Sequence, residues 1–116
     1  MSLEKFGDSF INFIYSLAKS QVLGEYDGIK VPNSCLAEAL TLSKVESPRR
    51  SDKHKKGDFV EKIVAKSWID RKITEEECVE IIKSAIMKYD LKERNEERKA
   101  IIEGFKDLLN EIKKRV

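Results

Sequence analysis

Apolar residues recur at intervals of three and four along most of the chain, which is the spacing of one face of an α-helix. The first such stretch covers residues 6–23, has a wide apolar face and ends before a glycine. The second covers residues 32–42, and the side chain of Asn33 or Ser34 is expected to cap its first turn. The pattern therefore predicts two helices in the first third of the chain.

A polar connector and two more helices are predicted in the middle of the chain. The connector covers residues 47–57. Asp58 follows it directly and is expected to cap a third helix, whose apolar positions extend to Trp68. Thr74 and the three glutamates after it resemble a capping box, which predicts the start of a fourth helix.

The last helix is predicted over residues 101–116, after a charged stretch at residues 91–99. No segment shows the apolar–polar alternation of a half-buried strand. We therefore predict an all-α fold, with one domain over residues 1–116 built as a bundle of about five or more helices around one core.

The composition fits one globular domain and excludes several other classes. No apolar run approaches the roughly 20 residues that span a bilayer, and the N-terminus lacks the pattern of a signal peptide. The expected location is therefore the cytoplasm, with no membrane partner. Two cysteines and one histidine are too few for a disulfide scaffold or an ordinary zinc cluster. We expect Cys35 and Cys78 to be buried and His54 to lie on the surface.

Two pairs of acids stand near predicted helix starts. Glu4 and Asp8 are four residues apart and Asp58 and Glu61 are three apart, so each pair shares one helix face. One interpretation is that these acids only stabilise the positive ends of the helix dipoles. The other is a metal site where the two pairs converge, because carboxylates without His or Cys ligands suit Mg²⁺.

Three segments carry a resemblance to a known family. Residues 4–9 (EKFGDS) are similar to the signature Glu-Phe-Leu-Gly-Asp-Ala/Ser, and residues 31–37 (VPNSCLA) to Val-Ser-Asn-x-x-Leu-Ala. Residues 57–65 (GDFVEKIVA) resemble Ala-Asp-x-x-Glu-Ala-Leu-Ile-Gly, and residues 68–70 (WID) stand where Tyr-Leu-Asp is common. In this order the segments resemble the ribonuclease III family.

The resemblance implies an all-α endonuclease domain that forms a homodimer and cuts double-stranded or structured RNA in RNA processing. The implied cofactor is Mg²⁺, with Mn²⁺ as an alternative. Glu4 and Asp8 match the acids of the first motif, and Asp58 and Glu61 match those of the second. The resemblance therefore implies four metal ligands, of which Asp8 and Glu61 are the principal catalytic ones.

Three lysines depart from the family pattern and keep other hypotheses open. Lys5 stands where the family usually has an aromatic residue that inserts into the dimer partner, and Lys62 and Lys66 replace small residues. They favour a catalytically inactive RNA-binding or scaffolding protein as the alternative. A helical interaction module, in which the acids only cap helices, is a third hypothesis. The end of the chain at Val116 predicts a stand-alone domain of an archaeal kind, without a double-stranded RNA-binding domain.

The polar connector concentrates positive charge, although the net charge of the chain is only +2. Its five cations are Arg49, Arg50, Lys53, Lys55 and Lys56. One interpretation is a solvated loop. The other is contact with RNA phosphates, because the connector leads directly into Asp58 and Glu61 and duplex RNA is bound mainly through its backbone.

Two further features allow more than one interpretation. Gly7 lies within a helical pattern, where it costs about 1 kcal/mol relative to Ala, so it either permits close helix packing or leaves room beside a metal. Phe10, Phe13, Tyr15 and Trp68 are expected in the core or a dimer interface rather than stacked on bases.

Overall fold

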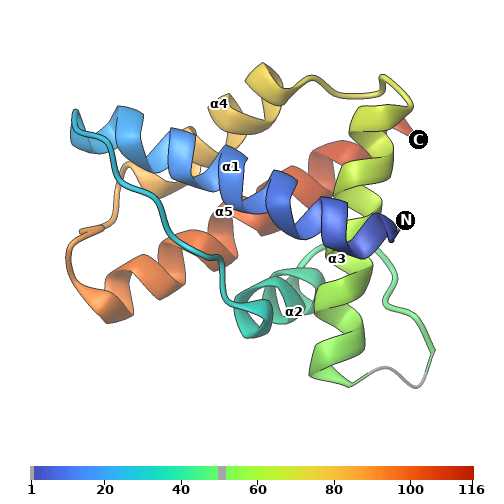
Figure 1. Ribbon diagram of the computed structural model, residues 1–116. Coiled ribbons are helices and arrows are strands. Elements are labelled where there is room, and N and C mark those ends of the chain that lie inside the picture. The colour runs from blue at the N-terminus through green and yellow to red at the C-terminus, as the bar shows by residue number, and fades with distance from the viewer. Residues whose placement is uncertain (1, 50–51) are drawn as a thin grey trace.

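The computed structural model describes residues 2–49 and 52–116, which form helices joined by short connections (Figure 1). The helices are α1 (Leu3–Leu23), α2 (Asn33–Leu42), α3 (Lys53–Ile69), α4 (Glu75–Ile86) and α5 (Arg94–Arg115). No strand occurs in these two ranges. The predicted all-α bundle of about five helices is therefore confirmed.

The starts of α1 and α4 follow from local hydrogen bonds. The Ser2 hydroxyl accepts a hydrogen bond from the Lys5 amide at the start of α1, and Gly24 ends this helix with a φ of 73°, which glycine adopts without strain. The predicted capping box of α4 is present, because Thr74 and Glu77 each bind the other's backbone amide.

The predicted cap of α2 and the predicted starts of α3 and α5 were wrong. Asn33 is the first residue of α2, which has no side-chain cap. α3 begins at Lys53, because the Asp52 carboxylate accepts a hydrogen bond from the Lys55 amide, and so Asp58 lies inside the helix rather than at its cap. α5 begins at Arg94, where the Glu93 carboxylate caps two amides. Most of the charged stretch at 91–99 is therefore helical.

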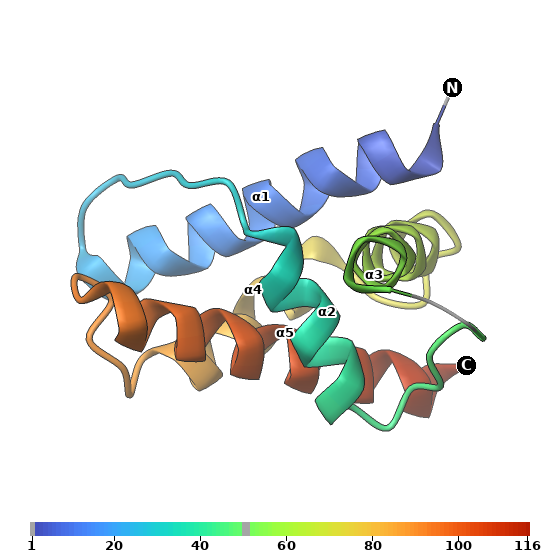
Figure 2. The same ribbon diagram turned by 90° about the horizontal axis from the view of Figure 1, so that it is seen from below.

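The helices pack as two long elements bridged by shorter ones. α1 packs on α3 and α4, α2 packs on α3 and α5, and α4 packs along α5. Figure 2 shows α1 and α5 on opposite sides of the molecule, with α3 seen nearly end-on at one end and α2 crossing in front. The first half of α1 therefore crosses α3 near its middle, where Gly7 contacts the backbone of Glu61.

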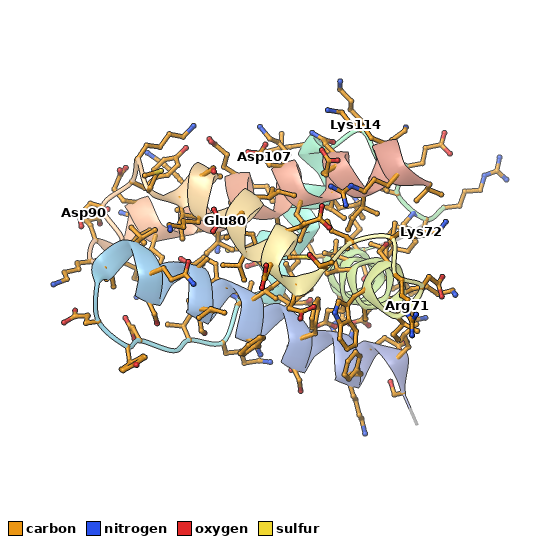
Figure 3. All side chains as sticks on the ribbon, turned by 90° about the horizontal axis from the view of Figure 1, so that it is seen from above. Arg71, Lys72, Glu80, Asp90, Asp107 and Lys114 are labelled. Atoms are coloured by element: carbon orange, nitrogen blue, oxygen red, sulfur yellow. The ribbon has the colours of Figure 1, made fainter. Side chains whose placement is uncertain are left out.

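The core is apolar, and charged residues such as Arg71, Asp90 and Lys114 lie at the periphery (Figure 3). Cys35 and Cys78 are buried and free, as expected. No helix in the described ranges is long and apolar enough to cross a membrane.

A buried polar network sits at the edge of the core. The Lys19 ammonium is 2.8 Å from Glu97 Oε2 and 3.0 Å from Asp27 Oδ2, although Lys19 is only 5% exposed. The Tyr15 hydroxyl donates a 2.8 Å hydrogen bond to the same Glu97 oxygen. This network joins α1 to α5 and to the connector between α1 and α2.

That connector is extended and is fixed to α1 by side chains. The Ile29 amide donates to Ser16 Oγ at 3.0 Å, and the Val31 amide donates to Asn12 Oδ1 at 2.7 Å. These two bonds hold the intervening Lys30 beside the first half of α1.

Candidate active site

α1 crosses α3 in close backbone contact at Gly7. A Cβ atom at this position would overlap the backbone carbonyl group of Glu61. Gly7 therefore serves close helix packing, which decides between its two interpretations. The next residue along α1 is Asp8, so the crossing brings the first acidic motif against the second.

Asp8 and Glu61 form the centre of the candidate site. Glu61 is 8% exposed, and this burial raises the pKa of its carboxyl to about 7. A hydrogen bond with Asp8 and the negative charges of Asp8 and Asp58 act in the same direction. The pKa of Asp8 is instead lowered, chiefly because the Lys30 ammonium binds its carboxylate. The two carboxyls therefore differ in protonation at intermediate pH.

Lys30 reaches both oxygens of the Asp8 carboxylate, at 3.0 and 3.1 Å. The sequence analysis did not single out this residue, since nothing in its local pattern predicts a contact 22 positions away. It is the one functional candidate that the connector between α1 and α2 adds to the site.

Glu4 and Asp58 stand on either side of this centre, each with a basic neighbour. Glu4 Oε1 is 2.9 Å from the Lys62 ammonium, and this bond, with one from Ser2, lowers the pKa of Glu4 to about 2. Asp58 Oδ2 lies 3.5 Å from His54 Nε2. The His54 side chain is 80% exposed, as expected for a surface residue, although it belongs to α3 rather than to a loop.

All four predicted acids line one hollow of about 600 Å³. α1 contributes Glu4 and Asp8, and α3 contributes Asp58 and Glu61. Lys5, Lys30, Asn33 and His54 are among the other lining residues. The two acidic pairs therefore converge on one space.

The chemistry of these donors fits a hard divalent cation. The lining acids offer only oxygen ligands, and the buried Glu61 forms no ion pair within the described residues. As the side chains stand, no three His, Cys, Asp or Glu residues of the described ranges form a group that could hold a metal ion. In this arrangement Lys30 and Lys62 hold Asp8 and Glu4 in ion pairs.

The two lysines that depart from the family pattern on α3 differ in role. Lys62 contacts Glu4 at the edge of the hollow. Lys66 instead pairs at 2.8 Å with Asp70, the residue that follows the end of α3. Neither lysine lines the hollow itself.

The predicted RNA-binding cations are divided between the connector and α3. Arg49 is exposed in the connector, and Arg50 lies outside the described residues. Lys53, Lys55 and Lys56 belong to the first turn of α3, so these three do not form a loop as predicted. Lys53 and Lys56 line a smaller hollow against α2. Lys55 is exposed and lines neither hollow.

Comparison with known proteins identifies the family of the chain. No curated protein sequence matches the chain. The sequence model of a family described as Ribonuclease III matches residues 1–116, which is the whole chain. The predicted resemblance is thus confirmed: the chain belongs to the ribonuclease III family.

Proposed function

We propose that this protein is a Mg²⁺-dependent endoribonuclease that hydrolyses phosphodiester bonds in double-stranded or structured RNA. The observation that carries the proposal is the convergence of two acidic pairs on one hollow, where Gly7 lets α1 touch the backbone of Glu61. Membership of the ribonuclease III family supports an RNA-processing role for such a site.

In this proposal Asp8 and Glu61 are the principal ligands of Mg²⁺, and Glu4 and Asp58 support them. When bound, Mg²⁺ supplies Lewis acidity for a water nucleophile and for the leaving oxygen. The buried position of Glu61 keeps its carboxyl away from bulk water, which strengthens its attraction to a cation. Lys30 and Lys62 compensate the negative charge of the cluster through Asp8 and Glu4.

The proposal also includes a homodimer that uses the outer face of α1. Phe6, Phe13 and Leu17 are 38%, 54% and 36% exposed, and their spacing places them on one face of the helix. The ring of Phe6 continues this surface to Trp68 of α3, with centroids 5.9 Å apart. An apolar stripe of this kind is typical of an interface between copies of a chain.

The aromatic residues that were expected in the core or an interface differ in burial. Phe10 and Tyr15 are buried, Trp68 is partly buried and Phe13 is exposed. Lys5 is also exposed, one position before the stripe begins. The proposed interface therefore depends on the stripe itself rather than on an aromatic residue at position 5.

Cleavage of a labelled RNA duplex by the purified protein tests the nuclease. We expect cutting with Mg²⁺, none with a chelator, and a loss of at least about 100-fold in the rate for Asp8→Asn and Glu61→Gln. Asp70→Asn is the matched control, because Asp70 pairs with Lys66 outside the hollow.

The alternative of an inactive RNA-binding protein also has an observation in its favour. Lys30 and Lys62 already occupy two of the four acids as ion-pair partners. If the folded protein binds the duplex but leaves it intact at every Mg²⁺ concentration, the nuclease proposal is wrong and this alternative takes its place.

A further inference from the structure

Three hollows adjoin one another around the start of α2. The first is the acid hollow described above. The second, of about 560 Å³, lies between the connector that carries Lys30, the start of α2 and the first turns of α5. The third, of about 340 Å³, is the smaller hollow between α2 and α3. Lys30 lines the first and second hollows, and Arg98 lines the second and third.

The second hollow has an excess of positive charge. Its charged lining residues are Lys30, Arg94, Glu97 and Arg98. Glu97 is compensated by the buried Lys19 ammonium and the Tyr15 hydroxyl, and Lys30 is paired with Asp8, so the two arginines supply the excess. The hollow is therefore suited to an anion.

The two arginines differ in how firmly they are held. Arg98 donates to Ser34 Oγ at 3.2 Å and to Cys35 Sγ at 3.3 Å, so its guanidinium is fixed to the start of α2. It is also 3.9 Å from Glu38 in the third hollow. Arg94 forms no hydrogen bond or ion pair within residues 2–49 and 52–116. All the donors of Arg94 are thus free for a ligand.

We propose that the second hollow is a phosphate subsite, in which Arg94 and Arg98 bind a backbone phosphate of the RNA strand that enters the acid hollow. This inference rests on the proposed function. A guanidinium group presents two parallel donors that match two phosphate oxygens. Lys30 lines this hollow and also binds Asp8, so the subsite adjoins the acid hollow.

The third hollow favours a strand of phosphates over a single free anion. It contains the cations Lys53 and Lys56, and Arg98 joins it to the second hollow. Both hollows are therefore basic and continuous, which suits a polymer with regularly spaced negative charges. An isolated phosphate ion would need only one of them.

The test is the affinity of the full chain for an RNA duplex, measured by fluorescence anisotropy in chelator over a series of NaCl concentrations. We expect Arg94→Gln to weaken binding about threefold to tenfold and to reduce the slope of log affinity against log salt by about one. Lys99→Gln is the matched control, since it removes one positive charge from the exposed surface of α5 outside the hollows and should leave affinity and slope unchanged. Arg94→Lys should recover part of the loss.

Two results would overturn the subsite. The first is an Arg94→Gln variant that binds the duplex with wild-type affinity and slope. The second is an NMR titration in which inorganic phosphate shifts the Arg94 side-chain signals although the variant binds RNA normally, because the hollow would then hold a free anion only.

The same experiments separate this inference from the proposed function. RNA binding that depends on Arg94 but is never followed by Mg²⁺-dependent cleavage would support the phosphate subsite and refute the nuclease proposal. If cleavage depends on Asp8 and Glu61 but duplex binding is unchanged in the Arg94 variant, the nuclease proposal is supported and the phosphate subsite is refuted.

Discussion

Glu61 is buried, and no positively charged group of the described residues contacts it directly. Its carboxyl lies against Asp8, and the negative charge of Asp58 also raises its pKa. The neighbouring acids Glu4 and Asp8 instead have lysine partners. Glu61 is therefore the residue of the site that gains most from a bound cation or from a proton.

We predict that, without divalent ions, the free energy of unfolding falls as the pH rises from about 4.5 to 7. The pKa of Glu61 is about 7 in the folded protein and has its ordinary value of 4.5 in the unfolded chain. The folded state therefore binds the proton more tightly, and this stabilisation is lost as the pH rises through 7. The expected change is about 1–3 kcal/mol.

Urea unfolding at pH 5 and pH 8 in chelator measures this change. Glu61→Gln carries no titrating proton, so its pH dependence should be smaller than that of the wild type by this amount. An equal dependence in both proteins would show that Glu61 ionises as freely as an exposed glutamate.

Sequence reasoning found the acids of the site but not their basic partners. Glu4, Asp8, Asp58 and Glu61 belong to ordered motifs, so their residue types identified them. Lys30 and Arg98 carry no such pattern. The Lys30 contact with Asp8 depends on the path of an extended connector, and the Arg98 contact with Ser34 spans 64 positions. Only the fold brings such pairs together.

At the scale of the helices, the contact between α1 and α3 decides the geometry of the site. Gly7 lies directly on the backbone of Glu61, so any side chain there would move the helices apart. The distance between Asp8 and Glu61 therefore depends on the absence of a side chain at position 7.

We predict that Gly7→Ala destabilises the fold by about 1–2 kcal/mol, because the overlap with backbone costs more than the helix propensity that alanine gains. Gly104→Ala is the matched control in α5. Its new Cβ would lie 3.3 Å from an Ile82 methyl, which would need to move by only a few tenths of an ångström, so the gain in propensity should roughly balance the contact. Thermal and urea unfolding of both variants provide the comparison, and a Gly7→Ala variant as stable as Gly104→Ala would contradict this account of the crossing.

The helices themselves were predictable from apolar spacing, whereas two of their starts were not. The first turns of α3 and α5 consist of charged and polar residues, so the apolar period begins only after them. The caps Asp52 and Glu93 also stand within charged runs that offer several similar candidates. The extended start of α3 has a consequence for the site, since it places Lys53 and Lys56 on a rigid helix beside α2.

At the scale of the whole molecule, the exposed apolar residues are gathered unevenly. Phe6, Phe13 and Leu17 share the outer face of α1, whereas Leu42 and Met87 are exposed on other parts of the surface. The α1 face is also continuous with the ring of Trp68. This asymmetry is the structural basis of the proposed homodimer.

We predict that Phe13→Glu converts the homodimer to a monomer, because it places a charge at the most exposed aromatic position of the stripe. Sedimentation equilibrium measures the mass of the variant and of the wild type. Met87→Glu introduces the same charge at a side chain that is 61% exposed outside the stripe, and it should leave the dimer intact. A monomeric wild-type protein, or a Phe13→Glu dimer of unchanged affinity, would refute the proposed interface.

In the proposed function, the acids where α1 and α3 cross cut RNA with the help of a divalent cation. The most direct test is the cleavage of a labelled RNA duplex, first in chelator and then after addition of excess Mg²⁺, by the wild type and by Glu61→Gln. We predict that cutting begins only after Mg²⁺ is added and is at least about 100-fold slower in the variant. Cutting in chelator, or equal rates for both proteins, would contradict it.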